Sequence, residues 1–261
     1  MRFTKLQALG NDFICLDATA SPLPEDLPAL ARAMTHRRLG VGGDGLLCVL
    51  PGDGRGLRMV LYNADGSRAA MCGNGLRCLA VYAWAEGLAD PALPLTVETD
   101  AGRRTLTAVP GGVRADMGRP VLSPPMELEA GGDRLRLWPV SMGNPHAVLF
   151  TGAPEESPLE RLGPALEGHP AFPGGVNVEV VEVLAPDRLR LRVWERGCGE
   201  TPACGTGACA AFAAAVRTGR AARRGRVELP GGVLALSWPE EDGPIALEGP
   251  AAIVFAGEWP G

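Results

Sequence analysis

One pattern of residues occurs twice in this chain at an almost constant distance, and this repeat limits the possible folds more than any other feature. In both copies a cysteine follows a polar residue by nine positions and precedes a glycine. Two pairs are 132 residues apart and two are 133 apart: Asn63 with Glu195, Cys72 with Cys204, Asn11 with Asn144, and His36 with His169. Four matched offsets predict two copies of one α/β unit.

Each copy has the same expected order of elements. Two short strands and an amphipathic helix come first, two strands and a cysteine-headed helix follow, and a hairpin ends the unit. The helices after the two cysteines are apolar nearly all round, so we expect strands to wrap them. The four expected helices are 25–36, 76–85, 158–169 and 207–216. Pro and Gly cluster at 116–127, which predicts units of 1–117 and 118–251, with a tail, 252–261, that returns to the first.

Composition argues against several classes of protein. A formal charge of −5 gives no electrostatic basis for binding nucleic acid or an anionic membrane. No apolar run reaches the roughly 18 residues that span a bilayer, and the first residues lack the apolar core of a signal peptide. We therefore expect a cytoplasmic protein. Seven cysteines without a C-x-x-C pair, and only three histidines, argue against both a disulfide framework and a metal site.

Cys72 and Cys204 stand where helices are expected to begin. A helix N-terminus carries partial positive charge and free N–H groups, which lower the pKa of a thiol and bind carboxylates. Small buried cysteines in a core are the commoner case, and that reading suits the cysteines within strand or helix patterns: Cys15, Cys48, Cys78 and Cys209. It suits Cys72 and Cys204 poorly, because glycines flank both at equivalent positions of the repeat.

Two thiols, one from each copy, suit stereoinversion, in which one group removes a proton and the other supplies a proton to the opposite face. On amino acids this chemistry usually needs pyridoxal phosphate bound to a lysine. Lys5, the single lysine of the chain, lies in the first expected strand. The sequence therefore favours a route without a cofactor.

Four segments in order resemble the signature blocks of diaminopimelate epimerase: "NADGSRAAMCGNG", "GNPHAV", "GVNVEVV" and "ERGCGETPACGTGACA". The resemblance covers nearly the whole chain. It implies an α/β (α+β) fold of two pseudo-symmetric units, each a mostly antiparallel sheet around a central buried helix. It also implies a homodimeric isomerase that interconverts LL- and meso-2,6-diaminopimelate without pyridoxal phosphate, for lysine and peptidoglycan synthesis.

The same resemblance implies roles for individual residues. Cys72 and Cys204 would be the two acid/bases. The substrate's distal end would be bound by four asparagines: Asn11, Asn63, Asn144 and Asn177. Glu195 and Arg196 would hold the reacting amino group. The reacting carboxylate would be bound at the two helix starts, by Gly73, Asn74, Gly205 and Thr206. His146 and Glu195 would set the pKa values of the cysteines.

Two other readings stay open at this point. A racemase or epimerase of proline or hydroxyproline is the nearer one, although that family typically has His where this chain has Asn74. A thiol redox or binding protein is more distant, since redox cysteines usually lie two residues apart. Two positions depart from the family pattern: Gly45 stands where many members have a polar side chain, and Cys198 stands where alanine is common.

Overall fold

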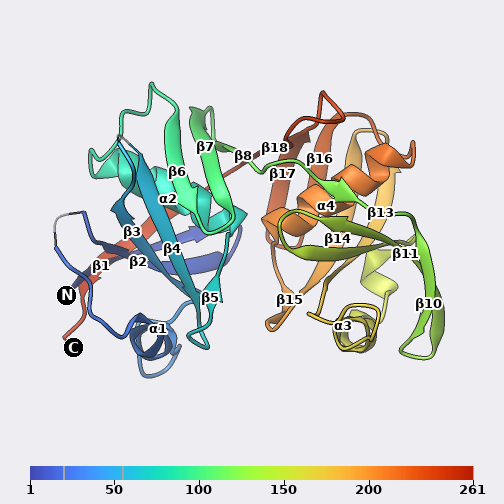
Figure 1. Cartoon of the computed structure of the whole chain (residues 1–261), viewed down its shortest axis with the longest axis horizontal. Helices are drawn as coiled ribbons and strands as arrows, with labels where there is room; N and C mark the ends of the chain where they lie inside the picture. The colour runs from blue at the N-terminus through green and yellow to red at the C-terminus, as the bar shows by residue number, and fades with distance from the viewer. Residues whose placement is uncertain (20, 55, 261) are drawn as a thin grey trace. The chain divides into compact units, whose positions relative to one another are not determined.

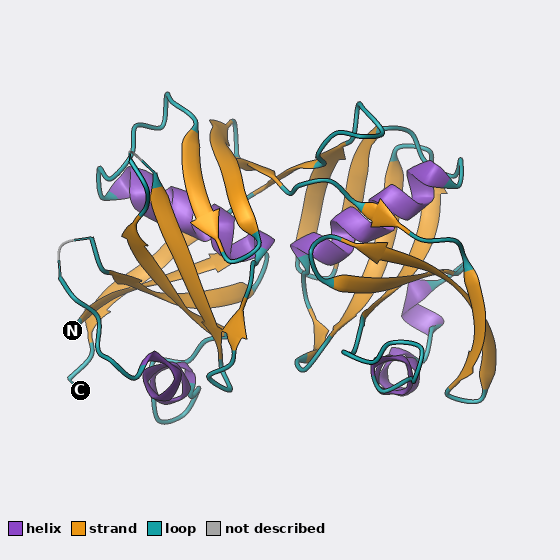
Figure 2. Cartoon of the chain, viewed as in Figure 1, coloured by secondary structure: helices purple, strands orange, loops and turns teal. Residues whose placement is uncertain are grey.

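The computed structural model describes residues 1–19, 21–54 and 56–260, and the chain divides into two units with the same order of elements (Figure 1). Unit 1 consists of Met1–Asp116 and Glu248–Gly261, and unit 2 of Met117–Leu247. Each unit contains a nine-residue and a thirteen-residue α-helix. Helices are purple in Figure 2.

The elements of unit 1 are β1 (Arg2–Ala8), β2 (Asn11–Asp17), α1 (Leu27–Thr35), β3 (Gly45–Pro51), β4 (Leu57–Asn63), β5 (Arg68–Ala69), α2 (Gly73–Ala85), β6 (Leu95–Thr99), β7 (Gly102–Val109), β8 (Gly112–Asp116) and β19 (Ala252–Glu258). Those of unit 2 are β9 (Val121–Leu122), β10 (Met126–Ala130), β11 (Asp133–Ser141), β12 (Pro145–Phe150), the 3-10 helix η1 (Pro154–Glu156), α3 (Leu159–Glu167), β13 (Asn177–Ala185), β14 (Arg188–Glu195), β15 (Gly199–Thr201), α4 (Gly205–Arg217), β16 (Arg224–Leu229) and β17 (Gly232–Ser237). β18 (Ala246–Gly249) carries the chain from unit 2 back to unit 1.

Most strand pairs in each unit are antiparallel, and the parallel pairs occur at equivalent places. β2 pairs with β3 and β4 with β6 in unit 1, while β12 pairs with β13 and β14 with β16 in unit 2. The registers match as well, because Phe13 lies opposite Gly45 and His146 lies opposite Asn177. The mixed α/β fold of two repeated units is thereby confirmed.

The two long helices lie inside their units. α2 packs against β1, β2, β3, β4, β7, β8 and β19, and α4 packs against β11, β12, β13, β14 and β17. All residues of α4 from Gly205 to Ala215 are buried. An all-round apolar helix needs such an enclosure, because every face of it loses contact with water. The expected wrapping of both cysteine-headed helices is therefore confirmed.

The two shorter helices cover their own sheets with one apolar face. Met34 of α1 packs with Ile14 and Leu46, and Leu162 of α3 packs with Val178. Gly163 lets α3 approach the indole of Trp194 closely, since a Cβ atom there would lie only 2.3 Å from the ring.

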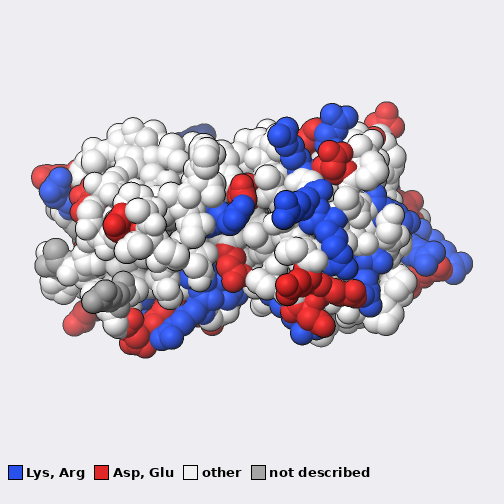
Figure 3. All heavy atoms as spheres, turned by 90° about the horizontal axis from the view of Figure 1, so that it is seen from above, with Lys and Arg blue, Asp and Glu red and all other residues white. Residues whose placement is uncertain are grey.

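The two chain ends lie side by side in unit 1, where β19 runs antiparallel to β1 (Figure 1). The amino group of Met1 donates to the carbonyl of Trp259 at 2.7 Å. On the face seen in Figure 3, basic and acidic side chains lie beside one another. No helix in the described part of the chain is long and apolar enough to cross a membrane.

Candidate active site

Both cysteines cap the start of a long helix, and they do so in the same way. Cys72 precedes α2, and its Sγ accepts a hydrogen bond from the backbone N–H of Gly75 at 3.4 Å. Cys204 precedes α4, and its Sγ accepts from the N–H of Gly207, also at 3.4 Å. Each thiol thus occupies the N-cap position, where an oxygen acceptor is usual and where the positive end of the helix dipole lies. The predicted placement of both cysteines at helix starts is correct.

Gly207, the third residue of α4, lies close to both Glu179 and Cys204. A Cβ on Gly207 would lie 2.7 Å from Oε1 of Glu179 and 3.4 Å from the thiol of Cys204. A side chain at this position would need Glu179 to move, which explains the glycine at 207.

The environment of Cys204 differs from the sequence-based expectation. We expected the helix start to lower the pKa of this thiol, but its pKa lies well above the usual value. Burial is the largest cause and the negative charge of Glu195 adds to it, whereas hydrogen bonds from Thr206 and Gly207 act in the opposite direction. The prediction of a lowered pKa is wrong for Cys204, because desolvation outweighs the hydrogen bonds from Thr206 and Gly207.

The cluster around Cys72 consists of Asn11, Cys72 and Asn74. Asn74 lies on the first turn of α2 and donates from Nδ2 to Oδ1 of Asn11 at 3.0 Å. The thiol of Cys72 lies 3.9 Å from the same oxygen. Asn74 is buried and Asn11 is half-buried. Two of the predicted substrate-binding residues of unit 1 are therefore in direct contact at the first cysteine.

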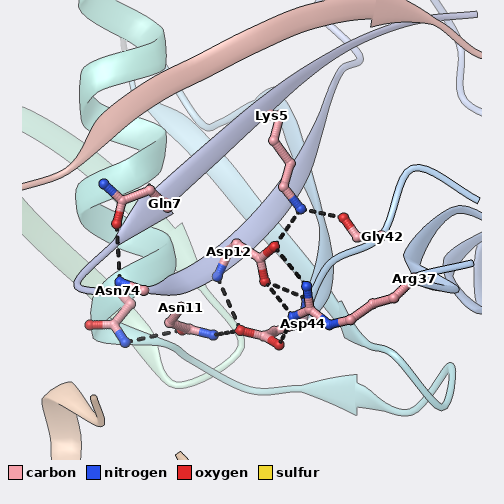
Figure 4. A network of polar contacts seen from close by, with 9 residues as sticks. Lys5, Gln7, Asn11, Asp12, Arg37, Gly42, Asp44 and Asn74 are labelled. Atoms are coloured by element: carbon pink, nitrogen blue, oxygen red, sulfur yellow. Dashed lines mark hydrogen bonds and ion pairs between the residues drawn. The ribbon is translucent and has the colours of Figure 1, made fainter. Parts of the chain in front are cut away.

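A charged network lies next to this cluster (Figure 4). Asn11 donates from Nδ2 to Oδ2 of Asp44 at 2.8 Å. Arg37 binds both Asp44 and Asp12, at 2.7 and 2.8 Å. The ammonium of Lys5 contacts Oδ2 of Asp12 at 2.6 Å and also the carbonyl of Gly42.

The cluster around Cys204 consists of Asn144, His146, Cys204 and Thr206. The hydroxyl of Thr206 lies 3.4 Å from the thiol, and Nδ2 of Asn144 donates to that hydroxyl at 3.4 Å. Nε2 of His146 lies 3.1 Å from Oδ1 of Asn144. Thr206 and Asn144 thus occupy the places in unit 2 that Asn74 and Asn11 occupy in unit 1.

Glu179 is a fully buried carboxylate that sequence reasoning missed. Its Oε1 lies 2.7 Å from Nδ1 of His146, and both side chains are shielded from water. Burial raises the pKa of Glu179, while His146 lowers it. Its second oxygen, Oε2, has no hydrogen-bond partner among the described residues. A glutamate within the apolar run "VNVEVV" was the signal that could have revealed it.

The remaining predicted residues lie at strand ends and turns. Asn177 is buried and links the start of β12 to the turn after β14, since it donates to the carbonyl of Pro145 at 2.8 Å and accepts from the N–H of Arg196 at 3.0 Å. The Arg196 side chain is exposed and donates to the carbonyl of Gly174 at 2.8 Å. Glu195 accepts from the hydroxyl of Thr201 at 2.5 Å.

Asn63 ends β4 and donates to the hydroxyl of Ser67 at 3.0 Å. Gly73 and Gly205 are the buried first residues of α2 and α4. Cys198 is exposed in the turn after β14. No group of three or more His, Cys, Asp or Glu side chains within residues 1–19, 21–54 and 56–260 is arranged to hold a metal ion.

The solved structures that share this fold include a hydroxyproline epimerase, a probable proline racemase and phenazine biosynthesis proteins. A phenazine biosynthesis protein of the PhzF family from Bacillus anthracis superposes with a TM-score of 0.76 at 16% identity, covering 98% of both chains. A hydroxyproline epimerase from Agrobacterium vitis superposes with a TM-score of 0.73 at 18% identity, covering 98% of this chain and 90% of that one. These similarities define the class of fold.

Sequence similarity identifies the family. Residues 3–123 and 139–254 match the family model of diaminopimelate epimerase. The chain is 49% identical to the diaminopimelate epimerase of Desulforudis audaxviator, over 99% of both proteins. It is 46% identical to the one of Moorella thermoacetica, over 100% of this chain and 99% of that protein. The chain belongs to the diaminopimelate epimerase family.

Proposed function

We propose that this protein is an isomerase that interconverts LL- and meso-2,6-diaminopimelate by proton transfer between the substrate α-carbon and two cysteines. The observation that carries the proposal is the pair of equivalent thiols, Cys72 and Cys204, each at a helix N-terminus. The matched repeat and membership of the family support it. The pathway that we assign to this activity is the synthesis of lysine and of peptidoglycan precursors.

In the proposed reaction one cysteine, as thiolate, takes the α-proton from one face of the substrate. The electron pair left on carbon delocalises into the carboxylate, which the N–H groups at the two helix starts stabilise. The other cysteine, as thiol, delivers its proton to the opposite face, so the configuration inverts. The reaction ends with the protonation states of the two cysteines exchanged, and the reverse direction uses the same groups.

The raised pKa of Cys204 fits this scheme if substrate binding creates the thiolate. Burial raises the pKa of Cys204 most, and the carboxylate of Glu195 raises it further. We assign Glu195, with Arg196, to the reacting amino group. A bound ammonium group would neutralise Glu195 and so favour the thiolate. The free protein would then keep Cys204 protonated, and the thiolate would form only beside substrate.

The other assignments follow the two clusters. We propose that the reacting carboxylate binds at the helix starts, to Gly73, Asn74, Gly205 and Thr206. The distal end of the substrate would bind the four asparagines Asn11, Asn63, Asn144 and Asn177. His146 would act on Cys204 through Asn144 and Thr206, which lie between them.

A pyridoxal cofactor does not fit the lysine that the chain offers. Lys5 is buried, and its ammonium is engaged by the carboxylate of Asp12 at 2.6 Å. A Schiff base needs a free amine, whereas this one is held in the ion pair. The proposed reaction therefore uses no cofactor.

The proposal is tested by NMR of LL-diaminopimelate in D₂O with purified protein and no added cofactor. We expect meso-diaminopimelate to form and deuterium to enter at the α-carbon. Proline in a parallel sample should remain unexchanged; comparable turnover of proline would favour a proline-type racemase instead. The homodimer and the cytoplasmic location stay predictions, and the mass in solution, measured by light scattering, tests the former.

A further inference from the structure

Arg77 is a fully buried cation that the proposed reaction does not use. It lies on α2, in the apolar segment "LRCLAVYAWA", and none of its surface is exposed. Its guanidinium donates to the carbonyl of Gly73 at 3.2 Å, to Oδ1 of Asn74 at 2.8 Å and to the carbonyl of Pro250 at 3.3 Å. Burying a charged group costs free energy, so a fully buried arginine calls for a specific role.

The contacts of Arg77 continue as a chain of hydrogen bonds with one direction. Arg77 donates to Oδ1 of Asn74, Nδ2 of Asn74 donates to Oδ1 of Asn11, and Nδ2 of Asn11 donates to Asp44. Figure 4 shows the last two steps. A guanidinium has only donors and a carboxylate only acceptors, so the two ends determine how both amides between them are turned. Turning both amides over would place donor against donor at Arg77 and acceptor against acceptor at Asp44.

We propose that Arg77 is a positioning residue, which fixes the amide planes of Asn74 and Asn11 and thereby holds the carbonyl oxygen of Asn11 toward the thiol of Cys72. That oxygen lies 3.9 Å from Sγ. Asn11 presents its acceptor to the thiol only because its donor is committed to Asp44. The consequence for catalysis at Cys72 rests on the proposed function, whereas the orientation of the amides does not.

In unit 2 different residues orient the equivalent amide, which is that of Asn144. The position equivalent to Arg77 is Cys209, a buried thiol that offers no fork of donors. Asn144 is instead held between His146 and Thr206. Loss of Arg77 should therefore disturb the amides of unit 1 and leave those of unit 2 unchanged.

The chain suits a direct test because it contains only five asparagines: Asn11, Asn63, Asn74, Asn144 and Asn177. Protein labelled with ¹⁵N-asparagine gives five side-chain NH₂ signals, and Asn11→Ser and Asn74→Ser proteins assign the two that matter. We compare the parent with Arg77→Met. The control is Arg104→Met, which removes a half-buried arginine of the same unit that donates to backbone carbonyls, one of them that of Ala101 at 3.1 Å.

We expect Arg77→Met to shift the NH₂ signals of both Asn74 and Asn11 and to speed their exchange with water, while the signals of Asn144 and Asn177 stay in place. Arg104→Met should leave all of these signals unchanged. If Asn11 is unaffected by Arg77→Met, the proposed chain of orientation is wrong. If the Met variant does not fold, Arg77→Lys serves instead, because lysine keeps the charge and lacks the planar fork. Unchanged Asn74 and Asn11 signals in that protein would equally refute the proposal.

Turnover of LL-diaminopimelate then links the orientation to the chemistry. We expect kcat/KM of Arg77→Met to fall roughly ten- to a hundredfold, as for other small misplacements of reacting groups. Equal values for Arg77→Met and Arg104→Met would contradict a role at Cys72. A parent protein without turnover would refute the proposed function, and the NMR result on Arg77 would still decide the orientation.

Discussion

The ion pairs that include Asp44, beside Cys72, and Glu179, beside Cys204, differ in their access to water. Beside the Cys72 cluster, Asp44 and Arg37 have side-chain exposures of 38% and 60%. Beside the Cys204 cluster, the pair of His146 and Glu179 has none. The backbone of the two helix starts is nevertheless the same, down to the N–H contact of 3.4 Å on each thiol. The repeat thus preserves the capping geometry, while the electrostatic surroundings of the two thiols have diverged.

Gly45 and Asn177 show the same divergence in the strands. Gly45 begins β3 and Asn177 begins β13. The two residues hold equivalent places where these strands pair in parallel with β2 and β12. A Cβ on Gly45 would lie 2.9 Å from the carbonyl of Tyr62, so a side chain there needs the backbone to move. Unit 1 therefore lacks a counterpart of the Asn177 amide, and the two units cannot contact a ligand identically.

The largest effect should come from removing either thiol. We expect Cys72→Ala and Cys204→Ala to lower the rate of epimerisation at least about a thousandfold, because each thiol serves one face of the α-carbon. The measurement is formation of the second isomer, followed by NMR in D₂O, with circular dichroism to check the fold. The matched controls are Cys78→Ala and Cys209→Ala, which remove buried thiols of the same two helices.

The two alanine variants should also differ in which isomer still exchanges its α-proton with D₂O. The remaining thiolate can still remove the proton on its own side and return a deuteron there, so the two variants should exchange opposite isomers. Near-normal epimerisation by Cys204→Ala would show that the two helix starts are not functionally equivalent and would end the two-base mechanism.

A smaller but still large effect is expected from Glu179→Gln, which changes the buried pair of His146 and Glu179 beside Cys204. The substitution keeps the shape and removes the acceptor charge next to His146, so kcat should fall about tenfold or more. Stability should stay the same or rise, since the pKa of Glu179 is raised by burial and a neutral amide avoids burying a charge.

This split between activity and stability distinguishes a positioning role from a purely structural one. The control is Glu182→Gln on the same strand, which removes a weaker contact to Arg190 at 3.4 Å. The control should leave kcat unchanged. Loss of stability in Glu179→Gln, with kcat unchanged, would mean that the pair supports only the fold.

The pKa of Cys204 gives an effect of intermediate size. Burial raises this pKa most and Glu195 next, so the free protein should react slowly with iodoacetamide at neutral pH and faster as the pH rises above about 9. In Glu195→Gln the negative charge is gone, and Cys204 should react several-fold faster at a given pH, up to about tenfold for one pKa unit.

Peptide mapping by mass spectrometry separates the reaction of Cys204 from that of Cys72. The rates of Cys204 and Cys72 are therefore followed separately in the Glu195→Gln protein. A slower reaction of Cys204 in this variant would mean that Glu195 acts through structure rather than charge.

The sequence predicted the parts of this molecule that depend on local pattern. The 132-residue offset located both capping cysteines, and the all-apolar segments after them located the two enclosed helices. The offset between Asn11 and Asn144 likewise identified equivalent residues of the two units, although their contacts with the helix starts were not predicted. These features occur in both copies, so the pattern in one copy supports the interpretation of the other.

What the sequence did not predict depends on burial and on contacts between distant residues. The pKa of Cys204 follows from how completely the surrounding strands exclude water, which a cap motif does not reveal. Glu179 contacts His146 through the parallel pairing of β12 with β13, and the directed chain from Arg77 to Asp44 joins three separate segments. Neither has a counterpart in the other unit, so the repeat gave no signal for them.

The smallest effect is expected from Arg37→Met, which removes an exposed arginine of the charged network next to the Cys72 cluster. Burial raises the pKa of Asp12, but hydrogen bonds from Arg37 and Lys5 outweigh it, and the pKa lies below the usual value. Such a carboxylate stabilises the fold above its unfolded-state pKa, and the contribution is lost as the pH falls through the lower, folded-state value. Arg37→Met should therefore reduce the free energy of unfolding at pH 7 by only about 0.2–1 kcal/mol, because the Arg37 side chain is 60% exposed.

Urea unfolding at pH 7 and at pH 3 measures this contribution, and the difference between parent and variant should shrink at the lower pH. Salt should shrink it too, since exposed ion pairs are screened. Arg38→Met is the control, because Arg38 is an adjacent exposed arginine outside the described contacts of Asp12 and Asp44. kcat/KM should change less than threefold in both, as Lys5 and Asp44 still hold Asp12 and Asn11 in place. A loss of activity in Arg37→Met as large as that in Glu179→Gln would refute the contrast between an exposed and a buried half.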